Sequence, residues 1–409
     1  MSGLPEAINR LAMPELADQI GVSLRDAERE LENAPGPDGL LDATYADTHR
    51  FPPPEWALPT FSAAAGGDGM TYTPYRGDRG VRESVAHNVS TALGIPTTGA
   101  AEVILTPGTQ GALFTALASL ISPGDLVLLP DPDYLSTERM LRYFGARVLR
   151  IPMLWPQSPA GHGRPRPALD LQALEDAAKQ RPRLLVFSHP NNPTGAIYGA
   201  DTIDAISELA QRYDFHVIAD ELYSRLVYDG EEFFHLAAKD GMAQRTVTLL
   251  GPSKTESLSG YRLGVAVAPA KLVEAMEDVQ SCTALRAPSY AQHLLGRWIG
   301  DDGEFVGQRI KEYEALRNTT VAKINASSVM RVRPSFGTAY VFPEVLTGAC
   351  DQDVALTLKK DAGVVVNPGY QFGPAGSGHM RLCFAQDEAV WDAALDRILD
   401  VVARVAPRP

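Results

Sequence analysis

One lysine and one arginine stand between two apolar runs in the stretch from Thr246 to Val267. It reads Thr-Val-Thr-Leu-Leu-Gly-Pro-Ser-Lys254-Thr-Glu-Ser-Leu-Ser-Gly-Tyr-Arg262-Leu-Gly-Val-Ala-Val. The β-branched run ends in Gly-Pro and a second run begins at Gly264, which predicts a strand, a loop and another strand. A lysine at a buried strand end loses hydration, so its amine is more easily neutral and can form an imine with an aldehyde. Taken alone, the pattern also fits a solvated loop lysine.

Two other predicted strands end in polar side chains. Leu184-Leu-Val-Phe runs into Ser-His-Pro-Asn-Asn192-Pro-Thr-Gly, a turn-rich segment whose rigid backbone would orient an amide. His216-Val-Ile-Ala ends in Asp220-Glu-Leu-Tyr223. A carboxylate at a buried strand end needs a cation or hydrogen-bond donors, because its burial is otherwise costly. A protonated pyridine nitrogen would serve as that partner.

A small-residue turn and an aromatic ring follow two further strands. Val103-Ile-Leu-Thr-Pro-Gly-Thr-Gln-Gly predicts a strand, a turn and a helix start, where backbone N–H groups can bind phosphate. The turn lacks the Walker lysine and the three glycines of a dinucleotide loop, so a nucleotide is not the first choice. The strand at Leu126–Pro130 precedes Asp131-Pro-Asp-Tyr134, which places a ring where open α/β sheets bind ligands.

These strands alternate with helical patterns from Val103 onward, which predicts an α/β fold with a mostly parallel sheet flanked by helices. We expect a large domain at residues 61–295 and a smaller α+β domain at residues 296–409. Residues 1–60 would form an N-terminal arm that belongs to the small domain. A long helix around Val306 to Ser327 would lead into that domain.

Composition describes an ordinary globular protein of 409 residues, 45% hydrophobic and 21% charged, large enough for two cores. With 37 Lys and Arg against 50 Asp and Glu, the net charge of −13 argues against nucleic acid as the main partner. The three cysteines lack the spacing of a disulfide framework or a zinc site, and we expect no metal. Without a signal-like start or an 18-residue apolar run, we expect a cytoplasmic protein that does not bind a membrane.

The N-terminal region from Ile8 to Ala34 is polar and helical, and it ends at Pro-Gly-Pro. Leu16 to Leu31 has the rhythm of a helix-turn-helix, a motif that heads some transcription regulators. The segment is acidic and close to the next domain, so an arm that packs on the body is favoured. Farther along, Asp47, Thr48 and His49 could face a substrate, although a turn is favoured.

Four motifs in this order resemble the fold type I pyridoxal-phosphate enzymes. They are Asn192-Pro-Thr-Gly, Asp220-x-x-Tyr223, Ser253-Lys254 followed by Arg262, and His-Met-Arg381-Leu-Cys-Phe-Ala. Within that group the chain is similar to the class I and II aminotransferases, over roughly residue 71 to the C-terminus. The resemblance implies a pyridoxal-phosphate-dependent enzyme that converts an α-amino acid to its 2-oxo acid.

The resemblance also implies catalytic roles. Lys254 would hold the cofactor as an internal aldimine and then move a proton between the substrate Cα and the cofactor C4′. Asp220 would pair with the pyridine nitrogen and keep it protonated. Asn192 and Tyr223 would hydrogen-bond the phenolic oxygen, and Tyr134 would stack on the ring.

The cofactor phosphate would bind the backbone N–H groups of Thr109 and Gln110. Ser253 would add a hydroxyl group and Arg262 a guanidinium to this site. Tyr72 resembles the tyrosine that reaches the phosphate from a neighbouring subunit. The resemblance therefore implies a homodimer with shared active sites.

Arg381 would bind the substrate α-carboxylate as a two-pronged donor, with Asn192 beside it. The run around Arg381 also fits an ordinary strand with an outward-facing arginine. Tyr72 and Tyr134 likewise fit aromatic residues of a core.

The loop around Lys254 departs from the family pattern. Gly251 stands where many relatives have a phosphate-binding serine, and residues 255–258 replace the usual small or aromatic loop. The reaction type therefore stays open at this point. Transamination is the simplest, while decarboxylation, elimination or oxidative deamination on the same fold is the alternative. A pyridoxal-phosphate-binding transcriptional regulator is a more remote alternative.

Overall fold

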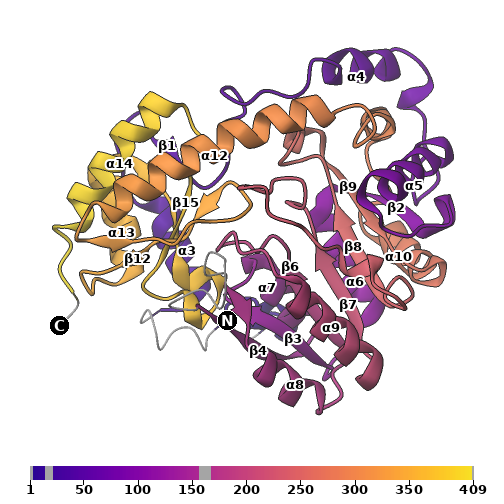
Figure 1. The fold of residues 1–409 in the computed structure, drawn as a ribbon, viewed down its shortest axis with the longest axis horizontal. Coiled ribbons are helices and arrows are strands. Elements are labelled where there is room, and N and C mark those ends of the chain that lie inside the picture. The colour runs from indigo at the N-terminus through magenta and orange to yellow at the C-terminus, as the bar shows by residue number, and fades with distance from the viewer. Residues whose placement is uncertain (1–2, 14–21, 156–166, 408–409) are drawn as a thin grey trace.

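A computed structural model describes residues 3–13, 22–155 and 167–407 of the chain. At its centre lies an eight-stranded sheet (Figure 1). From edge to edge, its strands are β2 (Val103–Pro107), β9 (Leu263–Val267), β8 (Thr246–Leu250), β7 (His216–Asp220), β6 (Leu184–Ser188), β3 (Leu126–Asp131), β4 (Arg147–Leu154) and β5 (Ala168–Leu169). The apolar runs that we used to predict strands all lie in this sheet.

Most neighbouring strands of the sheet are parallel. β8, β7, β6, β3 and β4 pair in parallel, whereas β9 is antiparallel to both of its neighbours and β5 is antiparallel to β4. Parallel strands bring their carboxyl ends to one edge, so the polar residues that follow them meet there. The predicted α/β class with a mostly parallel sheet is therefore confirmed.

Helices cover both faces of the sheet because its strands are apolar on both sides. In β6, Leu184 and Val186 pack in one core with α6 and α10, while Leu185 and Phe187 pack in another with α8 and α9. All four side chains are buried, which is typical of a strand covered on two faces. The helices of this part of the chain are α4 (Ala57–Ala65), which packs mainly on the segment around α11 rather than on the sheet, α5 (Arg79–Leu93), α6 (Gly108–Leu120), α7 (Leu135–Tyr143), α8 (Leu171–Ala178), α9 (Ala200–Tyr213), α10 (Ala270–Cys282) and α11 (Ser289–Gln292).

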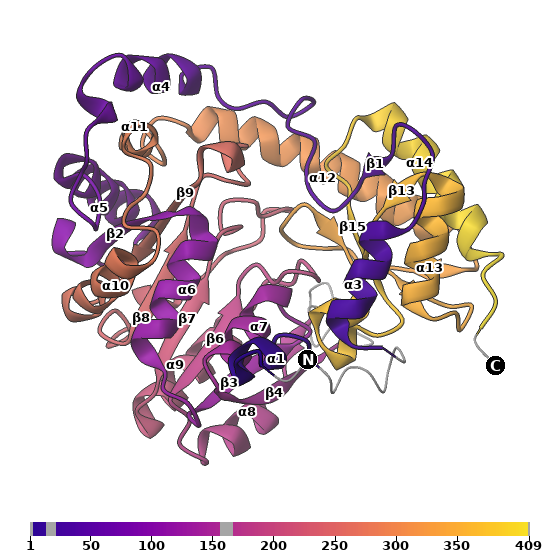
Figure 2. The ribbon, with the colours of Figure 1, turned by 180° about the vertical axis from the view of Figure 1, so that it is seen from behind.

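A second core lies beside the sheet and is built mainly from C-terminal segments. Trp391 and Leu395 of α14 (Glu388–Val402) pack there with Tyr340 and Leu382 of two short strands. The long helix α12 (Gly303–Asn325) extends along the upper side of the molecule, from the side of α4 to this second core (Figures 1 and 2). The remaining elements here are α13 (Asp351–Thr357) and three small sheets, β1–β13 (Leu41–Asp42, Val364–Val365), β10–β12 (Met330–Arg331, Glu344–Val345) and β11–β15–β14 (Tyr340–Val341, Met380–Cys383, Asn367–Pro368). Our division of the chain at residues 60 and 295 stays a prediction.

The N-terminal region forms α1 (Glu6–Arg10) and α3 (Leu24–Asn33), and the first part of the helix-turn-helix pattern lies outside the described residues. Glu28 of α3 pairs with Arg139 of α7 at 2.8 Å. Lys359 Nζ donates to the carbonyl oxygen of Leu31 at 2.8 Å. These contacts hold α3 on the rest of the chain. Across the described ranges, no helix combines the length and the apolar composition that a membrane span needs.

Candidate active site

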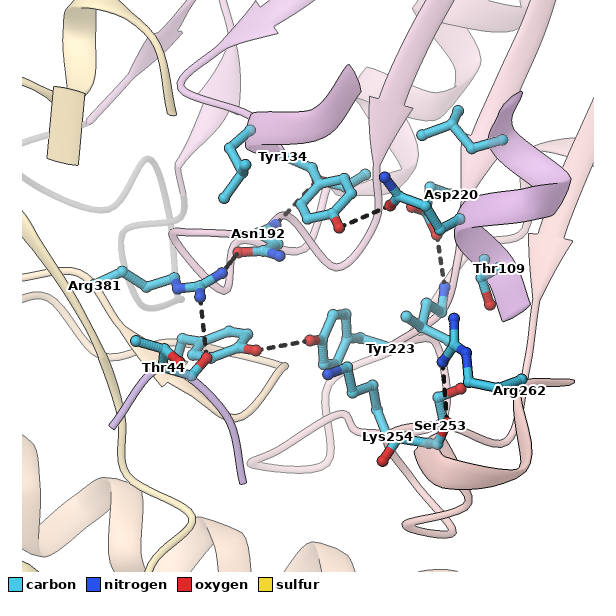
Figure 3. A pocket seen from close by; sticks show the side chains of 17 residues that line it. Thr44, Thr109, Tyr134, Asn192, Asp220, Tyr223, Ser253, Lys254, Arg262 and Arg381 are labelled. Atoms are coloured by element: carbon cyan, nitrogen blue, oxygen red, sulfur yellow. Dashed lines mark hydrogen bonds between the residues drawn. The ribbon is translucent and has the colours of Figure 1, made fainter. Parts of the chain in front are cut away.

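A cavity of about 280 Å³ lies at the carboxyl edge of the sheet, between the strand ends and the small sheet of β11, β14 and β15 (Figure 3). Ten of the eleven residues that we selected from the sequence line it. They are Thr109, Gln110, Tyr134, Asn192, Asp220, Tyr223, Ser253, Lys254, Arg262 and Arg381. Since these residues are spread over more than half of the chain, the fold brings them together. Tyr72 alone does not line the cavity.

Asp220 ends β7 and presents a carboxyl group to the cavity. Its Oδ1 accepts a hydrogen bond from the backbone N–H of Leu222 at 3.3 Å. Among the described residues, no lysine, arginine or histidine pairs with it. Burial raises the pKa of the Asp220 carboxyl to about 7. A ligand cation in the cavity would stabilise the ionised form of this carboxyl.

The turn before α6 packs against Arg262. A Cβ atom on Gly108, whose φ is +78°, would lie within 2.4 Å of Nη2 of Arg262, so only glycine allows this approach. No side chain of the described chain caps the N-terminus of α6. Free N–H groups and a guanidinium therefore meet at one place, which suits an anion such as phosphate.

Thr109 explains the glycine at position 251. A Cβ atom on Gly251 would lie 2.7 Å from Oγ1 of Thr109, so the threonine hydroxyl occupies the space that a serine there would need. Thr109 Oγ1 also donates to the carbonyl oxygen of Leu250 at 3.4 Å. The hydroxyl group of Thr109 in α6 therefore lies beside the position where a serine was expected from relatives.

Arg381 points into the cavity and is buried, with an exposed fraction of 5%. Its Nη1 donates to Oδ1 of Asn192 at 3.0 Å. Nη2 donates to the carbonyl oxygen of Thr44 at 3.0 Å and to Oδ1 of Asn367 at 2.5 Å. No carboxylate in the described part of the chain pairs with Arg381. The guanidinium therefore keeps its charge available for a ligand carboxylate.

Aromatic rings flank this arginine. Cζ of Arg381 lies 4.1 Å from the ring centre of Tyr340 and 4.9 Å from that of Phe372. The Tyr340 hydroxyl accepts a hydrogen bond from the Tyr223 hydroxyl at 3.2 Å. Burial raises the pKa of Tyr223 above its ordinary range. Tyr340 thus links Tyr223 to Arg381, and we did not select it from the sequence.

Tyr134 lies at the opposite side of the cavity and is fixed from two directions. Its hydroxyl donates to Oε1 of Gln110 at 2.9 Å. Its backbone N–H donates to Oδ1 of Asp133 at 2.6 Å, and Oδ2 of Asp133 accepts from the side chain of Asn191 at 3.0 Å. Burial raises the pKa of the Asp133 carboxyl to about 8. Asp133 therefore joins the Tyr134 turn to the turn that carries Asn192.

Seven further residues line the cavity that the sequence reasoning missed. They are Thr44, Leu113, Leu135, Ser188, Leu222, Ser259 and Tyr340. Thr44 contributes a backbone carbonyl group, for which no sequence signal exists. Asp47, by contrast, forms a turn, since its Oδ1 accepts from the backbone N–H groups of His49 at 2.8 Å and Arg50 at 3.3 Å.

Tyr72 is 85% exposed to solvent. Cζ of Arg286 lies 4.2 Å from the centre of its ring and 5.1 Å from that of Tyr75. This geometry excludes the interpretation of Tyr72 as a core aromatic. It leaves the ring free to contact another molecule.

Comparison with known proteins assigns the chain to a family. The model of the family described as "Aminotransferase class I and II" matches residues 42–398. Aromatic-amino-acid aminotransferase 2 of Thermococcus litoralis is 30% identical over 338 residues, which cover 82% of this chain and 85% of that protein. The aspartate/prephenate aminotransferase of Thermus thermophilus is 30% identical over 367 residues, covering 89% and 91%. The crystal structure of an aspartate aminotransferase from Rhodobacter sphaeroides superposes with a TM-score of 0.85 at 36% identity, covering 91% of this chain and 94% of that one.

The chain therefore belongs to the class I and II aminotransferase family. It is a pyridoxal-phosphate-dependent aminotransferase, and the resemblance predicted from its motifs is confirmed. The names of its relatives do not favour decarboxylation, elimination or oxidative deamination, nor a regulator.

Proposed function

We propose that the cavity at the sheet edge is the site where this aminotransferase holds its cofactor and its amino acid, with Lys254 as the catalytic amine. The observation that carries the proposal is the convergence of Lys254, Asp220, Arg262 and Arg381 on one cavity. Each supplies a charge or an amine that the reaction needs. No other use for this combination follows from their contacts.

The residues around the cavity suit pyridoxal phosphate. The buried carboxyl of Asp220, which has no cationic partner among the described residues, would pair with the ring nitrogen. The N–H groups of Thr109 and Gln110, with Ser253 and Arg262, would bind the phosphate. When bound, the cofactor supplies an aldehyde for amines and a ring that draws electron density from the substrate Cα.

Three side chains would orient the ring. Tyr134 would lie against its face, held by its hydrogen bond to Gln110. Asn192 accepts from Arg381 through Oδ1, which leaves its Nδ2 group to donate to the phenolic oxygen. Tyr223 would donate to the same oxygen, with Tyr340 as its alternative acceptor.

Lys254 would attach the cofactor and then carry the proton. Once the substrate amine has displaced Lys254, the Nζ atom of Lys254 would be able to take a proton from the substrate Cα and to deliver it to the cofactor C4′. Arg381, with Asn192 beside it, would bind the α-carboxylate and so hold Cα near that amine. Proximity of this kind accounts for a large part of the rate of many enzymes.

The proposal includes a homodimer in which each subunit completes the other's site. Tyr72 is exposed and does not line its own cavity, so it would donate to the phosphate bound in the partner subunit. Arg286 packs against the ring of Tyr72 and would therefore also lie near the site of the partner subunit. Among described residues, the cations that line the cavity are Lys254, Arg262 and Arg381.

Each of these three cations already has a proposed role. A substrate with a second carboxylate would therefore need a fourth cation to bind that group. Arg286 of the partner subunit is the candidate. Relatives named aspartate aminotransferase and aromatic-amino-acid aminotransferase support both dicarboxylic and aromatic amino acids as substrates to test. The variant R286A should lose activity with aspartate and glutamate but retain it with phenylalanine.

A spectroscopic half-reaction tests the proposal. Purified protein should carry a yellow chromophore that borohydride fixes to Lys254, as peptide mapping would show. Mixing with an amino acid should bleach the band and release one equivalent of 2-oxo acid and of pyridoxamine phosphate. Carbon dioxide or ammonia in place of these products would contradict transamination, and a label on another lysine would contradict the role of Lys254. Sedimentation analysis should give a dimer.

A further inference from the structure

The loop after Lys254 is joined to a buried ion cluster outside the cavity. Glu256, which follows the lysine by two residues, has an exposed fraction of 0%. Its Oε1 accepts a hydrogen bond from Nη1 of Arg225. The same guanidinium donates to both oxygens of Asp302, at 3.1 Å from Nη1 and 2.5 Å from Nη2. Two carboxylates therefore share one cation in the interior.

The cluster joins three segments that bear on the active site. Arg225 follows Tyr223 by two residues, as Glu256 follows Lys254. Asp302 directly precedes α12, and its Oδ2 accepts from the backbone N–H of Ile299 at 3.2 Å. The guanidinium of Arg225 thus sets the distance between the loops that carry Tyr223 and Lys254. A shift of either carboxyl group would break its hydrogen bond to this guanidinium.

A second buried arginine holds the same loop. Arg309 of α12 donates through Nη1 to Oγ of Ser257 at 2.8 Å and to the carbonyl oxygen of Thr255 at 3.4 Å. Ser257 has a φ of +57°, a left-handed conformation that costs energy for a serine. The shape of the loop therefore depends on contacts with α12 rather than on the preference of its own residues.

We propose that Glu256 is a positioning residue for Lys254: its bond to Arg225, shared with Asp302, fixes the place of Lys254 in the cavity relative to Tyr223. The proposal rests on the proposed role of Lys254 and assigns a role to the unusual loop at residues 255–258. Glu256 itself does not line the cavity.

The hydrogen bond from Arg225 does not require Glu256 to be ionised, because a carboxyl oxygen accepts in either form. Burial raises its pKa to about 8, against the opposing effect of Arg225. Its second oxygen, Oε2, has no hydrogen-bond partner among the described residues. A glutamine has the same shape and keeps the acceptor oxygen, so it reproduces the neutral form. This makes E256Q the conservative variant and E256A the disruptive one.

Steady-state kinetics of the holoenzyme would separate positioning from binding. E256A should lower kcat about a hundredfold, because a displacement of about 1 Å at a reacting group has that effect. KM for the amino acid should change less than about twofold, since Arg381 and Asn192 are untouched. E256Q should recover kcat to within about threefold of the unchanged protein. An E256A variant with normal kcat would overturn the proposal.

Hydrogen–deuterium exchange in the apoprotein supplies a readout that does not depend on catalysis. In E256A, exchange should accelerate at residues 221–226 and 252–258. D229N serves as the matched control, because it disrupts another buried pair, Asp229 with Arg317 at 2.9 Å. It should lower stability without changing exchange in either segment or kcat. Equal changes in E256A and D229N would reduce Glu256 to a structural role and contradict the proposal.

Two further controls keep the outcome decisive. If E256A does not fold, R225K takes its place, because a lysine keeps the charge but cannot bridge two carboxylates. R225K should lower kcat at least tenfold, and normal turnover would contradict the proposal. The unchanged protein must first show borohydride labelling at Lys254. Absence of that label would sink the proposed function itself, whereas a label with normal E256A kinetics would sink only this inference.

Discussion

The sheet-edge wall of the cavity carries Asp220, which ends the parallel strand β7, and Asn192 and Lys254, which lie in the segments that follow β6 and β8. The small-sheet wall, opposite, carries Thr44, Tyr340 and Arg381. Thr44 precedes Tyr340 by 296 positions and Arg381 by 337, and it reaches them because β1 pairs with β13. One wall is therefore built by the local rule that parallel strands end together, and the other by long-range packing.

The two walls also differ in the ionisable groups that they present to the cavity. Asp220 on the sheet-edge wall has a carboxyl whose pKa is raised to about 7 by burial, which suits proton chemistry. Arg381 on the small-sheet wall is held by carbonyl and amide oxygens and has no carboxylate partner among the described residues. We infer that substitutions on the first wall act mainly on kcat and those on the second mainly on KM. The predictions below test that division.

The largest effect is expected for K254A. Loss of the amine removes both cofactor attachment and the group that moves the proton, so kcat should fall at least about 10⁴-fold. Stopped-flow absorbance and steady-state assays would measure it. K311A, on the exposed side of α12, is the control and should leave activity unchanged. Residual activity of K254A above about one per cent would refute the role given to Lys254.

D220A comes next on the same wall. Removal of the carboxylate that we propose to pair with the ring nitrogen should lower kcat about 10² to 10³-fold, while KM changes little. Absorbance at saturating cofactor would establish that the variant is fully loaded. A loss that appears only in KM would place Asp220 with the small-sheet wall and break the comparison.

R381A should show the opposite pattern. Loss of the two-pronged donor should raise KM about a hundredfold, with kcat lowered less than tenfold. R381K should recover only part of the affinity, because a lysine lacks the planar fork. The decisive control is an amine without a carboxylate, with which the unchanged protein and R381A should react alike. If R381A weakens that reaction equally, Arg381 does not bind the carboxylate.

A smaller effect is expected on the stability of the apoprotein. Because the pKa of Asp220 is raised from 3.8 to about 7, the folded protein keeps a proton that the unfolded chain releases between those values. Stability should therefore fall as pH rises through that window. Between pH 4 and pH 7, the free energy of unfolding of D220N should decrease by about 1–3 kcal/mol less than that of the unchanged protein. Urea titrations at both pH values would measure this difference. Glu256, whose pKa is also raised, keeps its share in both proteins, whereas the pKa of Asp133 falls slightly in D220N because the charge of Asp220 helps to raise it. Identical pH profiles would show that Asp220 is not desolvated.

The smallest effect is expected for Y340F. The variant keeps the ring beside Arg381 and removes only the hydroxyl that accepts from Tyr223, so activity should change about two- to fivefold. Y340A also removes the ring and should raise KM about tenfold. Y313F is the matched control, because Tyr313 is equally buried but does not line the cavity. An equal change in Y313F would make the Tyr340 effect a matter of packing.

The sequence predicted the residues of the sheet-edge wall because the end of each strand can be recognised in the sequence. Apolar runs stop where a polar residue begins, as at Asp220, and parallel strands deliver those residues to one edge. It also found Arg381, through its motif rather than through its surroundings. It missed Tyr340 and Thr44, because a tyrosine in an apolar run resembles a core residue and every residue has a backbone carbonyl group.

The same limit applies to the departures around Lys254. Gly251 looked like a lost hydroxyl group, yet Thr109 fills the space beside it. Glu256 looked out of place in the loop, yet Arg225 and Asp302 surround it. Both compensations come from segments distant in sequence, so one position read alone could not reveal them.

By itself, the sequence determined the α/β class, the family and the strand ends that carry Asn192, Asp220 and Lys254. These follow from periodicity and from short motifs, which act over a few neighbouring residues. Only the tertiary structure decided which oxygens hold Arg381, which hydroxyl group lies beside Gly251 and which cation meets Glu256. Such contacts join residues that are far apart along the chain, and only the packing of the folded protein brings them within bonding distance.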